Sequence, residues 1–591
     1  MRRLWRNRNS KLEIRDSFEN GDGRRTRLQL SVALAVILAL WNMGGVCAAG
    51  QRASQDATAA GYRISGVVVD AMTGVVVPNA EVWTDGETRL RTVTNGEGRF
   101  VFDGVEEGKY PLNATATGYV KEAYNQHGSF STGIAVRTGL DSEHVVFKLH
   151  RQAAIYGRVT DERGDAVRRA RVMLFSEGVQ YGKHAVAVQR EIETNDLGAY
   201  RFAHLLPGNY YVGVAARPWW AQASVKYQSR VQTENTNAFA TAPSGQNGED
   251  PTFDVVYPFT YFAGATEDAG ATPLLAKAGD AIEANVQLTA VPAVHVLLTN
   301  MDAYKRRGQN PNVFAVQKPF GAAVVPINNV NSTEIAAGVY EVGGLPPGEV
   351  RLSVNSGGES EWDSHGMRLN AVDGERVDAT ARATTSIVSG VVVLADGSKE
   401  EMLGEITLHG EEGASSTKLE KDGTFRMPAL DEGTYEVAVN TRRRGNYVAK
   451  VTGIGAKVSG RAVKIEGAGE VRLTVTVGRG LGQVEGAVKI DGKPTAGVMV
   501  LMVPEVVGSP TEDFEELTRM DQSDSDGTFT LRSVVPGKYV LMAIQDGWDL
   551  EWKQEGVLGA YREKGMKVAV AAAEEKSVEV EGISTMVVDR R

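Results

Sequence analysis

The chain has 591 residues, which is too long for one hydrophobic core and predicts four or five domains. With 66 glycines and 7% aromatic residues, the composition favours many short strands joined by tight turns over long helices. The formal net charge of -10 argues against nucleic acid or an anionic membrane surface as a partner.

The N-terminal segment, residues 1–49, is typical of a basic leader followed by a signal peptide. Nine Lys or Arg lie in residues 1–27, and residues 28–51 are uncharged with a long apolar run. The small residues Ala48 and Ala49 predict cleavage after Ala49, which would place the protein in the periplasm, on the outer-membrane surface or outside the cell. An uncleaved signal anchor in the inner membrane is the alternative, because residues 28–46 could span a bilayer.

Cys47 is the only cysteine and lies inside this predicted signal segment. Its removal would leave a mature chain without disulfides, so we expect stability to come from sizeable hydrophobic cores.

A hairpin motif recurs five times after the leader with one fixed spacing. It reads glycine, any residue, an aromatic residue, seven residues, glycine, any residue, and Tyr or Val. Its copies are Gly98, Phe100, Gly108 and Tyr110; Gly198, Tyr200, Gly208 and Tyr210; Gly338, Tyr340, Gly348 and Val350; Gly423, Phe425, Gly433 and Tyr435; and Gly527, Phe529, Gly537 and Tyr539. Alternating apolar and polar residues predict two antiparallel strands, and the glycines are interpreted as requirements of backbone geometry rather than as a ligand cradle.

The spacing of the copies predicts an all-β protein, a tandem array of about five immunoglobulin- or transthyretin-like β-sandwiches of about seven strands each. We place the domains at residues 61–150, 151–290, 291–382, 383–480 and 481–591. The third is divergent, because its opening strand at 294–298 lacks the glycine found in the others. We expect each sandwich to fold separately and to contact only its neighbours in sequence.

The first two repeats resemble the carboxypeptidase regulatory-like domain, a transthyretin-like sandwich related to carbohydrate-binding-like folds and to collagen-adhesin B-type repeats. The resemblance is carried by residues 64–70 (Ile-x-Gly-x-Val-x-Asp), 78–82 (Pro-x-Ala-x-Val), 94–100 (Thr-Asn-x-x-Gly-x-Phe) and 206–212 (Leu-Pro-Gly-x-Tyr-x-Val). Copies four and five match well, and copy three mainly in its hairpin. The architecture resembles exported proteins of soil bacteria, particularly acidobacteria, in which such domains are joined without a catalytic partner.

No pattern predicts a catalytic or metal site, and we expect neither an enzyme nor a cofactor. His409 and Glu412 have the spacing of two zinc ligands in a carboxypeptidase, but His409 is the last histidine in the chain. A third zinc ligand of that kind is therefore missing.

Three aspartates, Asp521, Asp524 and Asp526, precede Gly527 in a manner that resembles a calcium loop. An EF-hand calcium loop would need acidic residues near positions 522 and 533, where this sequence has Gln522 and Ser533. The favoured interpretation is therefore an Asp-rich hairpin turn, and weak calcium binding is the alternative.

The candidate ligand site is a long aromatic insertion in the second domain. Its rings, on either side of a polar stretch, are Trp219, Trp220, Tyr257, Phe259, Tyr261 and Phe262. Flat aromatic faces stack on sugar rings, which makes carbohydrate the best prediction for the ligand. The alternative is that these rings cover the open edge of the second sandwich or its junction with the third.

The sequence thus predicts an exported, non-catalytic binding or structural protein of the cell envelope, with a glycan or an envelope protein as its partner. Alternatives are a protein-interaction or adhesion scaffold at the cell surface and an accessory chain to a separate hydrolase or outer-membrane receptor. Membrane contact is expected only through an uncleaved signal segment.

Overall fold

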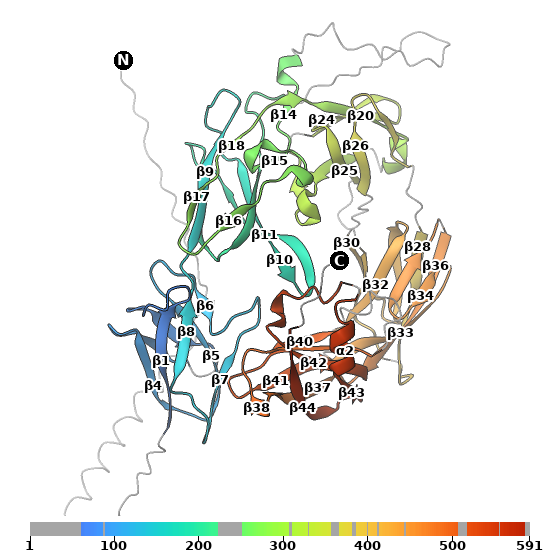
Figure 1. Ribbon diagram of the computed structural model, residues 1–591. Coiled ribbons are helices and arrows are strands. Elements are labelled where there is room, and N and C mark those ends of the chain that lie inside the picture. Colours follow the sequence, from blue (N-terminus) through green and yellow to red (C-terminus); the bar gives the residue numbers. More distant parts are fainter. Residues whose placement is uncertain are drawn as a thin grey trace, which may run out of the picture. The chain divides into compact units, whose positions relative to one another are not determined.

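The computed structural model describes residues 61–585 except 87–88, 223–250, 306–309, 329, 356–365, 381–385, 399, 411–412, 442–444, 468, 506–516 and 555. The predicted leader and signal peptide lie outside this range. The described residues are organised as five β-sandwiches in chain order (Figure 1).

The first two sandwiches each consist of two facing sheets. Sandwich 1 contains β1 (Tyr62–Asp70), β2 (Glu81–Thr84), β3 (Arg91–Val93), β4 (Arg99–Val105), β5 (Gly108–Thr115), β6 (Glu122–Ala123), β7 (Gly133–Val136) and β8 (Val145–Leu149). Sandwich 2 contains β9 (Ala153–Thr160), β10 (Arg171–Gln180), β11 (Lys183–Glu193), β12 (Ala199–Leu205), β13 (Gly208–Ala215), η1 (Pro251–Phe253), β14 (Val255–Val256), β15 (Thr260–Tyr261), η2 (Phe262–Gly264), η3 (Asp268–Gly270), β16 (Leu274–Ala276), β17 (Ala281–Glu283) and β18 (Val286–Gln287).

Sandwiches 3 and 4 repeat this arrangement. Sandwich 3 follows β19 (Val291–Pro292) and contains β20 (Val294–Thr299), η4 (Met301–Tyr304), β21 (Asn312–Gln317), η5 (Pro319–Gly321), β22 (Val325–Pro326), β23 (Asn331–Ala336), β24 (Val339–Leu345), β25 (Gly348–Asn355), β26 (Gly366–Ala371) and β27 (Arg376–Asp378). Sandwich 4 contains β28 (Ser386–Leu394), β29 (Gly404–Gly410), β30 (Gly413–Lys418), β31 (Thr424–Leu430), β32 (Gly433–Thr441), β33 (Asn446–Ile454), β34 (Lys457–Ser459), β35 (Ala462–Ile465) and β36 (Gly469–Arg479).

Sandwich 5 differs in that one strand joins its two sheets. It contains β37 (Gly482–Ile490), β38 (Lys493–Pro494), β39 (Met499–Pro504), β40 (Arg519–Gln522), β41 (Thr528–Val534), β42 (Gly537–Gln545), η6 (Gly547–Asp549), α2 (Gly559–Lys564), β43 (Met566–Val570) and β44 (Glu575–Ser584). The strand β44 pairs in parallel with β37 through residues 575–581 and with β42 through residues 582–584.

All five sandwiches share one strand topology. The opening strand pairs antiparallel with the first strand of the motif and parallel with the closing strand, as β1 does with β4 and β8. The same sets are β9 with β12, β17 and β18; β20 with β24 and β27; β28 with β31 and β36; and β37 with β41 and β44. The predicted all-β tandem array is confirmed.

The prediction that the two strands of the motif form a hairpin is wrong. The strand β4 pairs with β1, whereas β5 pairs with β2, β6 and β7 in the facing sheet. In the other four copies, too, the two motif strands have separate partners and do not pair with each other. The motif therefore connects the two sheets of a sandwich, because its alternating apolar residues reach the same core from opposite sides.

The first glycine of every motif copy has a left-handed backbone. The φ angles lie between +70° and +82° at Gly98, Gly198, Gly338, Gly423 and Gly527. A side chain is strained in this region, and in four repeats a Cβ here would also lie 2.4 to 2.9 Å from the carbonyl oxygen of a valine in the opening strand. Backbone geometry therefore explains this part of the motif.

The second half of the motif is fixed by its tyrosine. In four repeats the tyrosine ring lies over the second glycine, and its hydroxyl donates a hydrogen bond to the carbonyl oxygen four residues earlier. These pairs are Tyr110 with Glu106, Tyr210 with Leu206, Tyr435 with Asp431 and Tyr539 with Val535. Because both partners are local, the turn between the two sheets carries its own stabilising contact.

The glycine of the opening strand leaves room for the aromatic residue of the motif. Gly66, Gly157, Gly390 and Gly486 are the cross-strand partners of Phe100, Tyr200, Phe425 and Phe529. A Cβ at these glycines would lie 2.0 to 2.5 Å from a carbonyl oxygen of the closing segment, which in sandwich 2 is that of Ala284 between β17 and β18. The aromatic rings are buried, and each sandwich has its own apolar core.

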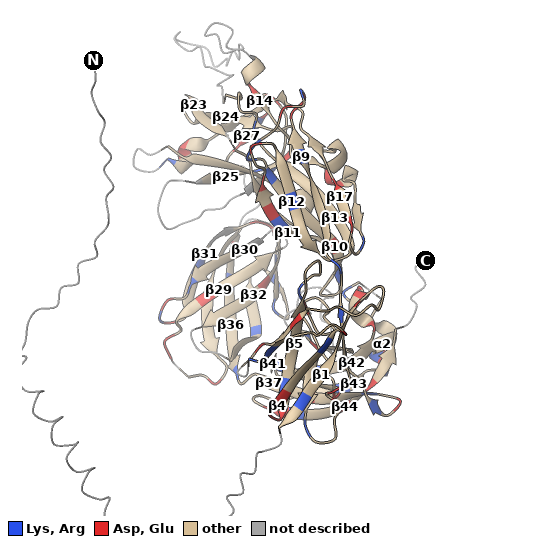
Figure 2. Ribbon diagram, turned by 90° about the vertical axis from the view of Figure 1, so that its left-hand side faces the viewer, with Lys and Arg blue, Asp and Glu red and all other residues tan. Residues whose placement is uncertain are grey.

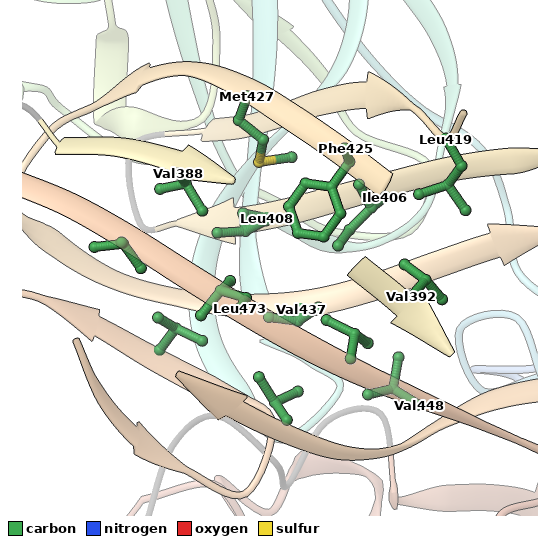
Figure 3. Close-up of a cluster of buried hydrophobic side chains, with 14 of the residues drawn as sticks. Val388, Val392, Ile406, Leu408, Leu419, Phe425, Met427, Val437, Val448 and Leu473 are labelled. Carbon is green, nitrogen blue, oxygen red and sulfur yellow. The ribbon is translucent and has the colours of Figure 1, made fainter. Parts of the chain in front are cut away.

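The core of sandwich 4 illustrates this packing (Figure 3). Phe425 on β31 points between the two sheets, where it meets Ile406 and Leu408 of the opposite sheet. Outside such cores, Lys and Arg are interspersed with Asp and Glu along the strands (Figure 2).

The expectation that each sandwich contacts only its neighbours in sequence is wrong. Sandwich 5 makes hydrogen bonds with sandwich 1, and the backbone N–H of Lys553 donates to the carbonyl oxygen of Gly182 at the tip of the β10–β11 hairpin of sandwich 2. A strand repeat alone carries no information about contacts between non-adjacent repeats.

Candidate functional site

Trp219 is an exposed aromatic side chain on a fixed turn. Its relative exposure is 86%, whereas Pro218 and Ala221 beside it are buried. The turn is closed by a 3.1 Å hydrogen bond from the N–H of Ala221 to the carbonyl oxygen of Pro218. Another of 2.8 Å joins the N–H of Gln222 to the carbonyl oxygen of Phe253. The indole therefore projects into solvent from a backbone that is held at both sides.

Trp219 packs against Trp220, which in turn packs against Tyr257. Trp220 is half-buried and meets Trp219 edge to face, with centroids 5.8 Å apart and planes at 82°. It also meets Tyr257 edge to face at 6.3 Å and 88°. Because Tyr257 belongs to the core of sandwich 2, this series of rings connects the exposed indole to the rigid interior.

The other predicted platform rings are not on the surface. Tyr257, Phe259 and Tyr261 have relative exposures of 7%, 3% and 1%, and Phe262 is half-buried against the core. A sugar-stacking platform needs exposed ring faces, so the six rings do not form one platform. Their burial matches the alternative interpretation, in which rings of this segment cover the second sandwich and its junction with the third.

The burial of these rings follows from short strands inside the predicted insertion. The strands β15 and β16 both pair with β13 and extend the sheet of sandwich 2. Tyr261 then packs against Phe320 of sandwich 3, with ring centroids 5.1 Å apart, and its hydroxyl donates to Asp268. Burial raises the pKa of Tyr261 far above its ordinary value, and the bond to Asp268 raises it further. The polar stretch 223–250 lies outside the described residues.

The cavity behind the turn is too small for a sugar. It is lined by residues of sandwiches 2 and 3, among them Arg217, Tyr257 and Val325, and its volume is about 30 Å³. That volume is of the order needed for a single water molecule. A ligand of Trp219 must therefore bind on the surface.

A buried imidazole joins sandwiches 2 and 3, and no pattern in the sequence predicts it. His295 on β20 is fully buried, and its Nδ1 lies 2.6 Å from Oε1 of Glu341 while its Nε2 lies 2.8 Å from Oδ2 of Asp254. Burial lowers the pKa of His295, but the hydrogen bonds to Asp254 and Glu341 outweigh it and raise the pKa to about 9. Both ring nitrogens thus donate to carboxylates, and the charged ring serves the junction rather than proton transfer.

The Asp-rich turn before Gly527 is occupied by protein contacts. The Asp521 carboxylate accepts hydrogen bonds from the backbone N–H groups of Gln522 and Thr530, at 2.8 and 2.7 Å, and burial raises its pKa. Asp524 and Asp526 interact with sandwich 1. In the described ranges, no three His, Cys, Asp or Glu residues gather in a way that could hold a metal ion.

The histidine considered for zinc lies on the outer side of sandwich 4. His409 is an exposed residue of β29, and Glu412 falls outside the described residues.

Residues 63–149 and 154–241 match the family model of the carboxypeptidase regulatory-like domain. Two consecutive segments of the chain are thus similar to this domain. The second match ends before β15 to β18, although these strands complete the sheets of sandwich 2.

The chain is also similar to solved structures of bacterial proteins, at low sequence identity. The Bacillus anthracis TIE protein is 11% identical, with 88% of this chain and 68% of that chain covered and a TM-score of 0.14. A streptococcal ancillary pilin is 14% identical over 49% of this chain and 99% of that chain, with a TM-score of 0.19. Two B repeat units of the collagen-binding protein of Staphylococcus aureus are 11% identical over 67% of this chain and 93% of that chain, with a TM-score of 0.13. No curated protein matches the chain.

Among the described residues, no helix has both the length and the apolar character that a membrane crossing requires.

Proposed function

We propose that this tandem regulatory-like protein is an exported, non-catalytic binding and structural protein of the cell envelope. Its second sandwich binds carbohydrate through Trp219. The leader sequence supports export, since its basic residues and apolar run are typical of a signal peptide.

The exposure of Trp219 is the observation that carries the ligand class. An indole at 86% exposure offers a flat apolar face to a ligand, and its fixed turn reduces the entropy lost on binding. A sugar ring can stack on the indole face while its hydroxyls reach polar groups at the rim. Arg217 and Gln222 flank the indole in the sequence, are both exposed and could supply those groups.

A glycan array with three forms of the chain tests this function. We expect the wild-type chain to bind a subset of glycans and Trp219→Ala to lose them. Phe314→Ala, which removes another exposed aromatic residue from sandwich 3, should bind as the wild type does. Equal binding by wild type and Trp219→Ala, or no binding by the wild type on a broad array, would reject the carbohydrate proposal. Either result would favour the adhesion scaffold.

A further inference from the structure

An edge strand of sandwich 1 is capped by the turn between β40 and β41 of sandwich 5. The N–H of Gly133 on β7 donates to Oδ1 of Asp524 at 2.8 Å, and its carbonyl oxygen accepts from the N–H of Ser525 at 2.9 Å. Two residues further along β7, the N–H of Ala135 donates to Oγ of Ser525 at 2.8 Å. The turn therefore makes the hydrogen bonds that a further strand would make at this edge.

A buried glutamine extends the contact beside the turn. Gln522 is 2% exposed, and its amide nitrogen donates to the carbonyl oxygen of Asn125 at 2.7 Å and to Oγ1 of Thr132 at 2.8 Å. Its amide oxygen lies 3.0 Å from Nδ1 of His127. Both polar ends of this side chain are thus satisfied by sandwich 1, as buried amides require.

Stacked rings and ion pairs complete the surface. The imidazole of His127 lies flat on the indole of Trp548, with centroids 4.9 Å apart and planes at 5°. Lys109 Nζ lies 2.6 Å from Oδ2 of Asp524. Near it, Arg137 is 3.6 Å from Asp526. Basic groups on sandwich 1 therefore face acidic groups on sandwich 5.

Strand β7 shows what the contact covers. Ile134 and Val136 point into the core of sandwich 1, so Ala135 between them faces outward, yet Ala135 is only 3% exposed. Among the described strands, β7 pairs with β5 alone. Without the turn, it would be an edge with free N–H and C=O groups, which is a template for association.

The two halves of this contact lie about 390 positions apart and are different surfaces, so a second copy offers the same complementary surface as the chain's own sandwich 5. We propose that the turn at Asp524 and Ser525 also docks on β7 of a second copy of this chain, in a head-to-tail association. The same hydrogen bonds would form between two chains as form within one. The balance therefore depends on how the local concentration of chains compares with the effective concentration inside one chain.

Mixed single-cysteine chains test the association. One chain carries Ala135→Cys and the other Ser525→Cys, each with Cys47→Ser so that no other thiol is present. On mild oxidation we expect a disulfide-linked heterodimer joined at these two positions, at least ten times above a control mixture in which Thr452→Cys replaces Ser525→Cys. Unchanged melting temperatures of the single variants will show that the chains are folded.

A charge reversal at the turn is a second test of the association. Asp524→Lys removes the acceptor of the Gly133 bond and faces Lys109, so it should reduce the heterodimer to the control level. Glu420→Lys, at the equivalent turn position of sandwich 4, should leave the heterodimer unchanged. Both residues accept the turn hydrogen bond from the glycine three residues later. The proposal is overturned if the mixture gives no heterodimer above control, whether or not the double variant Ala135→Cys/Ser525→Cys closes within one chain.

Discussion

Asp254 of sandwich 2 accepts a 2.8 Å hydrogen bond from the fully buried His295 of sandwich 3. The opposite ring nitrogen bonds to Glu341, and the backbone N–H of His295 lies 3.2 Å from Oδ1 of Asp373. Removing the imidazole would leave a buried carboxylate at Glu341, so the three side chains stabilise the junction as a set.

This arrangement makes the stability of the junction fall at alkaline pH. The pKa of His295 is raised from 6.5 to about 9, so its contribution is complete below pH 6.5 and is lost as the pH rises through about 9. At about 1.4 kcal/mol per pH unit, the loss is on the order of 3 kcal/mol. Denaturant unfolding of wild type and His295→Gln between pH 6 and 10 measures it. A constant difference between the two across that range would show that His295 is not charged in the fold.

The opening-strand glycines should not tolerate alanine. In sandwich 5, a Cβ at Gly486 would lie 2.5 Å from the carbonyl oxygen of Val578 and 2.6 Å from the ring of Phe529. We expect Gly486→Ala to destabilise by about 3 kcal/mol, at the upper end of the effect of overpacking. Gly178→Ala on β10, where a Cβ meets open space, should change stability by less than about 0.5 kcal/mol. Calorimetry measures the stability loss of both variants. Equal losses would contradict the proposed role of the opening-strand glycine.

The tyrosine hydroxyls of the motif should each stabilise the fold by one hydrogen bond. Tyr539→Phe removes the bond to the carbonyl oxygen of Val535, in a site where Tyr539 is 2% exposed. The expected cost is about 1 kcal/mol. Tyr110→Phe in sandwich 1 should cost a similar amount, because its hydroxyl donates to Glu106 in the same way. Chemical denaturation measures the free energy of unfolding of each variant. No loss of stability in either variant would mean that water replaces the hydrogen bond.

The buried rings of sandwich 2 should act on stability and not on binding. Tyr261 is 1% exposed and packs on Phe259 and Phe320, so Tyr261→Ala should destabilise by about 3–5 kcal/mol. Trp219→Ala should leave the melting temperature unchanged, since the indole is almost fully in solvent. A small effect of Tyr261→Ala would indicate that this junction is open in solution.

The turns of the motif could be predicted because their determinants are local, whereas the predicted pairing of its two strands was wrong because their true partners are distant in the sequence. A left-handed glycine such as Gly527 and a tyrosine that bonds four residues back, such as Tyr539, are visible as fixed spacings. The bond between Gly133 and Asp524 spans 391 positions and depends on how two folded sandwiches meet, so no short pattern indicates it.

The candidate site could be predicted only in part for a related reason. Aromatic residues near Trp219 were identified, but their burial depends on β15 and β16, which are two and three residues long. Strands of that length are too short to show a hydrophobic period. Which rings face water therefore became evident only from the sheet that these strands extend.

Isothermal titration of a glycan identified on the array tests the central claim most directly, namely that Trp219 is the ligand contact. Trp219→Ala should weaken the binding at least about fivefold, since one stacked ring contributes about 1–3 kcal/mol. Phe314→Ala should bind with wild-type affinity. If Trp219→Ala binds as tightly as the wild type, the exposed indole is not the binding site and the account of this surface is wrong.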